Sequence, residues 1–421
     1  MSLVGDTIVA KEANALQFQL LDKYLSCPVD SQKEWWEKTG PVLASLMTSA
    51  GYTEQAQCQY LMFFYTSVVP FLGPYPQTFP SAMTHNELPL ELSTNFQQLG
   101  DARPVIRIAI EPITCLSGTK EDPYNLSPIR DFLTRLEKLN IEGYDDRLFE
   151  HFYPVHTLNK DECQELQSRK EYIREISQVA FGFDLKPNAI SVKGYTFPGV
   201  RCFAKKEDMF TFVIGSVQDY LGNTDSYNTM GLIKDYIETT DARENFGFVY
   251  SNDCITPEKS RHKLYGRTKD MSWNKVQEIW TFGGRIESPE TQKGLEYLQR
   301  LWSIFKMGAP HPLGIHLVWN YETKAGLKVP VTKIYFPVYG LNDLDNARAI
   351  AQYLKEIGLD VHGDFYEQSV RDCFPELDIK DTDRVICWVS FAYTEKTGVY
   401  LSVYYHSSLE YPGFKERNAP A

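Results

Sequence analysis

The sequence predicts an α+β protein built on a closed barrel of ten antiparallel strands inside a ring of helices. Three observations predict this fold. Strand-like segments come in consecutive pairs, five such pairs are separated by pairs of helix-like segments, and the units recur at similar intervals. This self-similarity indicates a repeat of ββαα type. Closure removes the exposed edges of an open sheet, so a barrel is favoured.

Residues 1–75 are predicted to be helical and to pack on the outside of the barrel. Their apolar residues recur every three or four positions, as in helices with one buried face. Pro28 and Gly51 separate the segments. The three predicted helices span 7–24, 33–50 and 53–71.

Strand pairs and helix pairs alternate along the rest of the chain. No linker or low-complexity segment interrupts them, so residues 1–421 are predicted to form one domain. The predicted strand pairs are 88–92 with 105–110, 180–185 with 189–197, 245–252 with 261–266, 313–321 with 329–338, and 385–393 with 399–405. The predicted helices span 128–139, 160–178, 206–221, 228–239, 273–282, 289–305, 344–357 and 364–373.

Composition and charge narrow the class of protein. Of 421 residues, 43% are hydrophobic and 23% charged, as in ordinary globular proteins. The net charge of −12 argues against nucleic acid as a partner, because binding to a phosphate backbone needs a basic face. No segment resembles a signal peptide, and no run of 18 apolar residues could cross a membrane. We expect a cytoplasmic protein without membrane association, and a homodimer stays open as an alternative to a monomer.

Metal-binding patterns are absent from the sequence. The eight cysteines are scattered and form no CxxC pair, so we expect free thiols and no zinc site. Asp145 and Asp146 resemble the Asp-rich motif with which some all-helical enzymes hold Mg²⁺, but those enzymes carry two such motifs. We interpret this pair as a turn or a helix cap. No phosphate-binding GxxxxGK[ST] loop is present.

A basic stripe is the strongest functional signal. Side chains two apart on a strand share a face, so Arg261, Lys263 and Tyr265 are predicted to point the same way. The Lys-x-Tyr spacing recurs in the second strands of other pairs. With ten strands, the interior is wide enough for a cavity. The predicted inward-facing cations are Arg107, Lys193, Arg261, Lys263 and Lys333.

Five converging cations indicate an anion site. Burying them without acidic partners would be costly unless an anion joins them, and a diphosphate has the several negative charges required. The alternative is that each cation pairs with a carboxylate on a neighbouring strand.

Tyrosines two residues beyond the lysines suggest a second role. Aromatic faces next to a diphosphate can stabilise the cation that remains when the diphosphate leaves, and they keep water away. The alternative is simple packing of the barrel interior, and strand parity leaves the choice between Tyr404 and Tyr405 open. The candidates are Tyr195, Tyr265, Tyr335 and Tyr404.

Glu91 is the candidate catalytic carboxylate. It lies between Leu90 and Leu92 in the first predicted strand, so it is placed to face the cavity alone and to accept a proton or hydrogen bond. The alternative is a carboxylate at the strand edge that pairs with Arg107 or Arg103.

Six groups of motifs are distributed over nearly the whole chain. They are LPLELS at 88–93, IRIAIEP at 106–112, FDLK at 183–186 with VKGY at 192–195, RHKLY at 261–265, KIYFP at 333–337 with GLND at 340–343, and YLSVYYH at 400–406. Together these motifs resemble the fungal aromatic prenyltransferases of the dimethylallyl tryptophan synthase family. The resemblance implies the ABBA barrel fold and transfer of a dimethylallyl group from its diphosphate to an indole, without an essential metal or other cofactor.

The same resemblance assigns roles to the candidate residues. The five cations would bind the diphosphate of dimethylallyl diphosphate, the four tyrosines would shield the allylic cation, and Glu91 would contact the indole N–H. Ala180 stands where relatives that act on free tryptophan have a proton-accepting Lys, and Phe248 stands near their carboxylate-binding Arg. The small Ala109 leaves room in the acceptor pocket.

These departures favour a larger, neutral acceptor such as a tryptophan-containing cyclic dipeptide or a related indole alkaloid precursor. The alternatives are prenylation of free tryptophan, tyrosine or another aromatic. A further alternative is a barrel that binds an anionic metabolite without catalysis.

Overall fold

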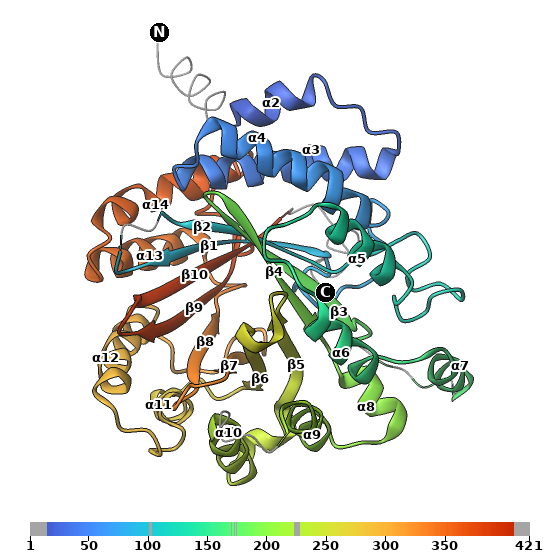
Figure 1. Cartoon of the computed structure of the whole chain (residues 1–421). Coiled ribbons are helices and arrows are strands. Elements are labelled where there is room, and N and C mark those ends of the chain that lie inside the picture. Colours follow the sequence, from blue (N-terminus) through green and yellow to red (C-terminus); the bar gives the residue numbers. More distant parts are fainter. Residues whose placement is uncertain are drawn as a thin grey trace, which may run out of the picture.

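The computed structural model describes residues 15–100, 103–169, 171, 173, 175–222 and 228–407. Ten strands form a closed barrel in which all neighbouring pairs are antiparallel, and β1 pairs with β10. This confirms the predicted fold (Figure 1). The strands are β1 (Leu90–Gln97), β2 (Val105–Ile110), β3 (Val179–Lys186), β4 (Ala189–Thr196), β5 (Phe246–Asp253), β6 (His262–Thr268), β7 (Leu317–Thr323), β8 (Val331–Pro337), β9 (Ile386–Thr394) and β10 (Gly398–His406).

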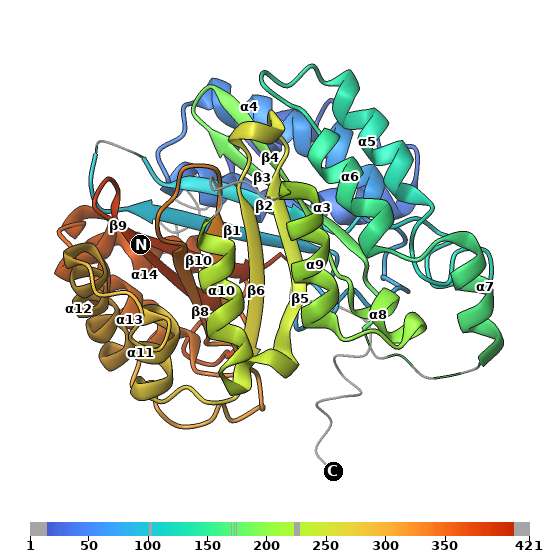
Figure 2. The same ribbon diagram turned by 60° about the horizontal axis from the view of Figure 1, so that its bottom comes forward.

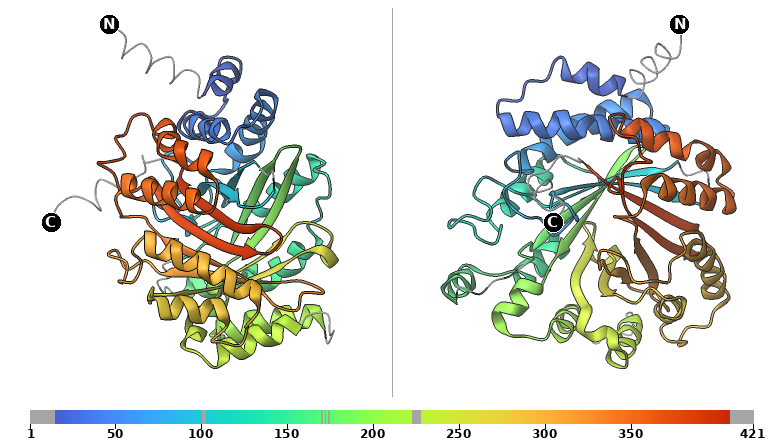
Figure 3. Two further views of the ribbon diagram at one scale, coloured as in Figure 1. Left: turned by 90° about the vertical axis from the view of Figure 1, so that its left-hand side faces the viewer. Right: turned by 180° about the vertical axis from the view of Figure 1, so that it is seen from behind.

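Helices surround the barrel on all sides, as the views from the side and from behind show (Figures 2 and 3). Short 3-10 turns lie at Val69–Phe71, Asp241–Asn245 and Pro257–Lys259, and a π turn lies at Phe64–Val68. The helices are α2 (Leu16–Asp22), α3 (Asp30–Ser49), α4 (Glu54–Phe63), α5 (Pro128–Lys138), α6 (Arg147–His156), α7 (Lys160–Arg169), α8 (Gly199–Lys205), α9 (Met209–Leu221), α10 (Asn228–Glu238), α11 (Trp273–Thr281), α12 (Pro289–Ile304), α13 (Asp343–Glu356) and α14 (Asp360–Cys373).

The connections differ from the predicted helix pairs in the first half of the barrel. Three helices follow each of the first two hairpins, and α6 and α8 were not predicted. The helix predicted at 206–221 begins only at Met209, because Lys206 adopts a left-handed conformation and Asp208 caps the new helix. The helix predicted at 160–178 ends at Arg169. Residues 7–14 of the first predicted helix lie outside the described residues.

The N-terminal helices fill the sector of the ring between α14 and α5 (Figure 1). The ring of Phe63, at the end of α4, lies 5.2 Å from that of Phe183 on β3, and the ring of Phe71 lies 4.9 Å from that of Phe132 on α5. The N-terminal segment thus covers the barrel between the helices of the last described repeat and those that follow the first hairpin. Among the described residues, no helix has the length and apolar character needed to cross a bilayer.

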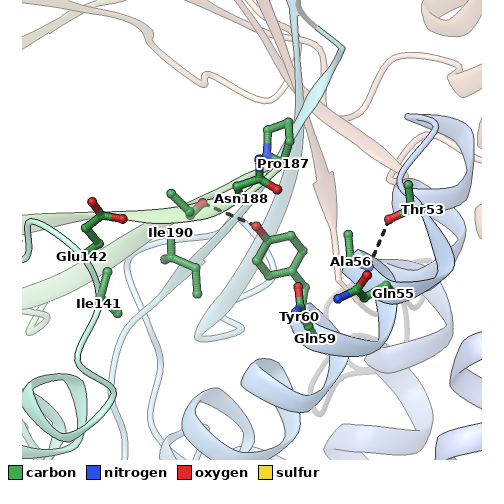
Figure 4. A pocket seen from close by; sticks show the side chains of 11 residues that line it. Thr53, Gln55, Ala56, Gln59, Tyr60, Ile141, Glu142, Pro187, Asn188 and Ile190 are labelled. Atoms are coloured by element: carbon green, nitrogen blue, oxygen red, sulfur yellow. Dashed lines mark hydrogen bonds between the residues drawn. The ribbon is translucent and has the colours of Figure 1, made fainter.

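Two tyrosines fasten this segment to the β3–β4 hairpin. The hydroxyl of Tyr52 donates a hydrogen bond to the Leu185 carbonyl of β3 and accepts one from the Ile106 N–H of β2 at 3.0 Å, and the Tyr60 hydroxyl donates to the Lys186 carbonyl. Tyr60 points toward the tip of the hairpin beside a cavity of about 440 Å³ (Figure 4). None of the predicted site residues lines this cavity, which lies outside the barrel.

Polar residues extend β1 beyond its predicted end. The strand was predicted at 88–92 and lies at Leu90–Gln97. Leu90 and Leu92 point outward into the helical layer and are fully buried. Ser93 and Asn95 lie opposite Arg107 and Val105 in the β1–β2 ladder. Because the lumen is polar, the inward-facing residues of β1 are polar too. Apolar residues alone therefore do not reveal the full length of this strand.

Candidate active site

The first charged cluster in the lumen is centred on Asp184. Arg107 on β2 faces Asp184 on β3 across the ladder, and the Arg107 Nε lies 2.6 Å from the Asp184 Oδ1. The ammonium of Lys193 on β4 pairs with the same oxygen. Burial opposes ionisation of Asp184, but the charges of Arg107 and Lys193 hold its pKa well below the usual value.

The second charged cluster is centred on Asp253 at the end of β5. The Arg261 Nη2 donates to Asp253 Oδ1 at 2.9 Å, and the Lys263 ammonium lies 3.5 Å from that oxygen. Arg261 also donates to Glu322 Oε2 on β7 at 3.2 Å. Arg261 precedes β6 and Lys263 lies within it, so the predicted basic stripe faces the lumen with Tyr265.

Four of the five cations therefore have carboxylate partners, and the expectation of cations without acidic partners is wrong for them. Each partner comes from a neighbouring strand, as the alternative interpretation held. Three carboxylates, Asp184, Asp253 and Glu322, pair with these cations, so the two clusters together with Lys333 retain a formal excess of two positive charges before Glu91, which lies in the same lumen, is counted. That excess is available to a bound anion.

Lys333 on β8 is the exception. Its ammonium donates to Ser402 Oγ at 3.0 Å and lies 5.1 Å from the centre of the Tyr335 ring. Among the described residues, no carboxylate lies within 4.0 Å of it. Burial, with the nearby charges of Arg107 and Lys193, holds the pKa of Lys333 well below 10.5. Burial and Arg107 likewise lower the pKa of Lys193 to about 7, against the pull of Asp184.

Three of the predicted tyrosines form a row next to Lys333. The ring centres of Tyr265 and Tyr335 are 6.3 Å apart, and those of Tyr335 and Tyr404 are 6.0 Å apart. Tyr404 faces the lumen, whereas the hydroxyl of Tyr405 lies 2.8 Å from that of Tyr366 in the outer helical layer. The structure thus decides the parity that the sequence left open.

Tyr195 faces the lumen on β4. Its ring lies over Gly182 on β3, where a Cβ atom would come within 3.3 Å of it. Ala180 lies opposite Tyr195 in the same ladder. A small residue at each of these positions gives the tyrosine ring its space.

Tyr400 belongs to the site and was not predicted. Its hydroxyl accepts a hydrogen bond from the Arg107 Nη2 at 2.6 Å, and the Lys333 ammonium lies 5.3 Å from the centre of its ring. The signal was present in the sequence, because Tyr400 has the same strand parity as Tyr404.

Two glycines in the site strands leave space for bulky side chains that pack on the outer face of the barrel. Gly194, between Lys193 and Tyr195, turns its outer face to Phe149 of α6, and a Cβ atom there would overlap the ring. Gly266 follows Tyr265 and abuts Trp319 in the same way. The Lys-Gly-Tyr sequence therefore joins two lumen-facing residues through a position that tolerates no side chain.

Glu91 lies in the lumen without an ion pair among the described residues. It stands opposite Ala109 on β2 and His406 on β10. Burial raises its pKa to about 8. The alternative pairing does not occur, because Arg107 pairs with Asp184, and Arg103 donates to the Gly51 carbonyl at 2.9 Å.

The residues predicted for the acceptor pocket lie around one end of the lumen. The Phe248 ring centre is 6.5 Å from that of Tyr265, and Phe248 lines a cavity of about 760 Å³ together with Val318, Trp388 and His85. Ala109 and Ala180 occupy lumen positions opposite Glu91 and Tyr195.

The Asp145–Asp146 pair has a structural role. Asp146 immediately precedes α6 and its side chain makes no capping hydrogen bond, whereas Asp145 Oδ1 accepts a hydrogen bond from the Arg147 N–H at 3.1 Å. Of the two predicted roles, this confirms the turn and not the side-chain helix cap. Within the described residues, no group of three His, Cys, Asp or Glu side chains is arranged to hold a metal ion.

A family model and several known proteins match this chain over most of its length. The family model for tryptophan dimethylallyltransferase matches residues 31–369. The prenyltransferase phqI of Penicillium fellutanum is 44% identical over 418 residues, which span 91% of this chain and 90% of that protein. Deoxybrevianamide E synthase notF of an Aspergillus species is 36% identical, spanning 93% of this chain and 91% of that protein.

Solved structures agree with the sequence relatives. NotF in complex with brevianamide F and DMSPP superposes with a TM-score of 0.86 at 37% identity, covering 94% of this chain and 99% of that one. AnaPT from Neosartorya fischeri has a TM-score of 0.85 at 30% identity, covering 93% and 98%. The chain therefore belongs to the tryptophan dimethylallyltransferase family and is an indole prenyltransferase.

Proposed function

We propose that the enzyme transfers a dimethylallyl group from dimethylallyl diphosphate to the indole of a tryptophan-containing cyclic dipeptide or a related precursor, without a metal ion. The observation that carries this proposal is the arrangement of charged and aromatic side chains in the lumen of the barrel. An excess of positive charge lies beside a row of tyrosines, and Glu91 lies in the same lumen. The NotF structure, which contains brevianamide F and DMSPP, supports a prenyl donor and an indole-containing acceptor as the ligands of this chain.

The charged clusters would drive the first step. When the carbon–oxygen bond of dimethylallyl diphosphate breaks, the electron pair leaves with the diphosphate and an allylic cation remains. Arg107, Lys193, Arg261, Lys263 and Lys333 would stabilise the developing negative charge. Asp184 and Asp253 hold their cations in fixed positions, so little reorganisation is needed at the moment of ionisation.

The tyrosines would protect the cation. Tyr195, Tyr265, Tyr335 and Tyr404 present aromatic rings to the lumen, and the negative faces of such rings stabilise a cation. They also occupy the space from which water would attack.

Glu91 would activate the acceptor. Its carboxylate would accept a hydrogen bond from the indole N–H as the pyrrole ring attacks the cation, forming the new carbon–carbon or carbon–nitrogen bond. The proton lost from the indole leaves the ring, so the products are prenylated indole, diphosphate and a proton. Glu91 is the candidate for accepting that proton because no cation neutralises it.

Charge pairing at the acceptor end favours a neutral acceptor. Ala109, Ala180 and Phe248 carry no charge, and Arg267, whose guanidinium lies 4.9 Å from the centre of the Phe248 ring in the same cavity, already pairs with Glu175 at 3.6 Å. A cyclic dipeptide has no free carboxylate or amine, so it avoids the cost of burying an unpaired charge.

One assay tests the proposal and ranks the acceptors. Purified enzyme is incubated in EDTA with dimethylallyl diphosphate and, separately, a tryptophan-containing cyclic dipeptide, free tryptophan and tyrosine. We expect prenylated product with the cyclic dipeptide at the highest kcat/KM. Faster turnover of free tryptophan would overturn the acceptor assignment. Absence of product with every acceptor, despite diphosphate binding, would favour a non-catalytic anion-binding barrel.

We further propose that residues 1–421 act as one domain in the cytoplasm. The contacts of the N-terminal helices with the barrel support the first part, and the eight unpaired cysteines support the second. We expect eight reactive thiols in protein unfolded without reductant, and fewer would contradict a reducing compartment.

A further inference from the structure

Glu111 is a fully buried carboxylate that the reaction does not use. It follows the last residue of β2, and its side chain has no exposed surface. Its Oε2 accepts hydrogen bonds from Ser81 Oγ and Ser177 Oγ, both at 2.6 Å, and its Oε1 accepts one from Asn125 Nδ2 at 3.0 Å. Unlike Asp184 and Asp253, it has no ion pair among the described residues.

The three donors belong to three separate segments. Ser81 precedes β1, Asn125 precedes α5, and Ser177 precedes β3. Ser177 Oγ also accepts the Ala82 N–H at 2.9 Å, which links the first segment to the third. Burial raises the pKa of Glu111 to about 7 although all three hydrogen bonds oppose that shift. Burying a carboxyl group costs free energy, and the hydrogen bonds from these three segments offset that cost.

Two of these segments form part of the wall of the acceptor-side cavity. Ser81 and Ser177 line it, and so does His85, which the first segment carries. The His85 ring stacks between Trp388, at 5.1 Å, and Tyr339, at 5.2 Å. Trp388 comes from β9 and lines the same cavity. The position of His85 against the barrel therefore depends on how its segment is anchored.

We propose that Glu111 is a positioning residue for the acceptor, which holds the His85-bearing segment 81–88 in place as one wall of the acceptor pocket. The proposal rests on the proposed function, because it assigns the 760 Å³ cavity to the indole acceptor. Glu111 touches neither the diphosphate cluster nor the tyrosine row. Its loss should therefore weaken acceptor recognition and leave the donor site unchanged.

Two substitutions distinguish the effect of the length of the Glu111 side chain from the effect of its charge. Glu111→Asp keeps the charge but shortens the side chain by one methylene, so it cannot hold all three donors at hydrogen-bond distance. Glu111→Gln keeps the length. Its oxygen can still accept from Asn125, and the serine hydroxyls can turn to accept from its amide. We expect the Asp variant to raise KM for the cyclic dipeptide at least about fivefold and the Gln variant to stay within about twofold.

Ligand binding at the donor site and the mobility of segment 81–88 can each be measured independently of acceptor binding. In Glu111→Asp, KM for dimethylallyl diphosphate and Kd for inorganic pyrophosphate should stay within about twofold of the wild type. Amide hydrogen exchange of segment 81–88 should become faster. Ser177→Ala, which removes one hydrogen bond to Glu111 and the partner of Ala82, is a milder variant in case Glu111→Asp does not fold, and should shift the same measurements in the same direction.

Val276→Ala is the matched stability control. Val276 is fully buried on α11, which contributes no residue to the cavity, so its truncation should lower the melting temperature without changing either KM. An unchanged acceptor KM in Glu111→Asp, or equal changes for donor and acceptor, would overturn the proposal. A wild-type enzyme that forms no prenylated indole would instead overturn the proposed function, and the exchange rates of segment 81–88 would still test the anchoring.

Discussion

Arg107 and Asp184 face each other across the β2–β3 ladder, with the Arg107 Nε 2.6 Å from the Asp184 Oδ1. The pair lies inside the barrel, where an unpaired charge is costly. Asp184 therefore fixes Arg107 in the orientation in which it also donates to Tyr400. Donors that bind a leaving group are most effective when they are held in place before the reaction.

Arg107→Ala should abolish most turnover and also weaken the fold. We expect turnover to fall at least about 100-fold, because a donor to the leaving diphosphate is lost. The free energy of unfolding should fall by about 3 kcal/mol, since Asp184 is left with Lys193 alone. Adding Asp184→Asn should restore neither stability in urea unfolding nor turnover, because it leaves the buried Lys193 without its carboxylate partner. Single-mutant turnover within tenfold of wild type would contradict the diphosphate role.

Lys333→Met should separate binding from stability. Lys333 has no carboxylate partner in the described part of the chain, so replacing its buried amine with an apolar side chain of similar length should leave the melting temperature unchanged or raise it. Inorganic pyrophosphate should bind about tenfold more weakly in calorimetric titration, because a charge-assisted hydrogen bond is lost. Lys333→Arg is the charge-retaining control. A large drop in melting temperature would show that Lys333 holds the empty barrel together.

The ionisation of Glu91 should appear in the pH profile. Burial raises its pKa from 4.5 to about 8, so the carboxyl is mainly protonated at pH 7, and only its ionised form can take the proton of the indole N–H. With dimethylallyl diphosphate saturating, kcat/KM for the acceptor should rise through about pH 8 and level off above it. Glu91→Gln should be slow and should lack this rise. A flat wild-type profile would remove Glu91 from the proton transfer.

The same shift predicts a change in stability. Because the folded pKa of Glu91 lies above the unfolded value, its protonation stabilises the fold below pH 4.5, and that contribution is lost as pH rises through about 8. Between these limits the free energy of unfolding should fall less steeply with pH in Glu91→Gln than in the wild type. Parallel curves would contradict the raised pKa.

Tyr335→Leu should divert the allylic cation to water. Tyr335 is the central ring of the row, and its loss removes an aromatic face from the cation. We expect the ratio of dimethylallyl alcohol to prenylated indole to rise at least about threefold, measured by chromatography of both products. Tyr335→Phe keeps the face and loses the hydroxyl's hydrogen bonds with Asn320 and Tyr265, so its ratio should stay close to that of the wild type.

Gly194→Ala should disturb the site from outside the barrel. The new methyl group would overlap Phe149 of α6, so we expect a loss of about 1–3 kcal/mol in urea unfolding, together with reduced turnover from the displaced Lys193 and Tyr195. Gly215→Ala on α9 is the control, because a Cβ atom there meets nothing within 4 Å. It should unfold no more easily than the wild type. Equal unfolding free energies and turnover in the two variants would show that α6 shifts to accommodate the methyl group.

Strand parity made the lumen residues predictable. Alternation along one strand decides which side chains share a face, so Lys193 with Tyr195 and Lys263 with Tyr265 could be assigned to one side from their spacing. The same rule includes Tyr400, which was overlooked. Short-range periodicity similarly predicted most helices, but α6 is only ten residues long and contains Pro154, so its pattern was too weak.

The sequence by itself thus determined the repeat, the barrel and the face on which the site residues other than Tyr404 lie, because these follow from periodicities of a few residues. Only the tertiary structure decided which charges meet. Arg107 and Asp184 are 77 positions apart, and Arg261 and Glu322 are 61 apart, so their pairing depends on the register between strands. Register depends on the stagger with which ten strands close into a barrel, and no local pattern carries that information.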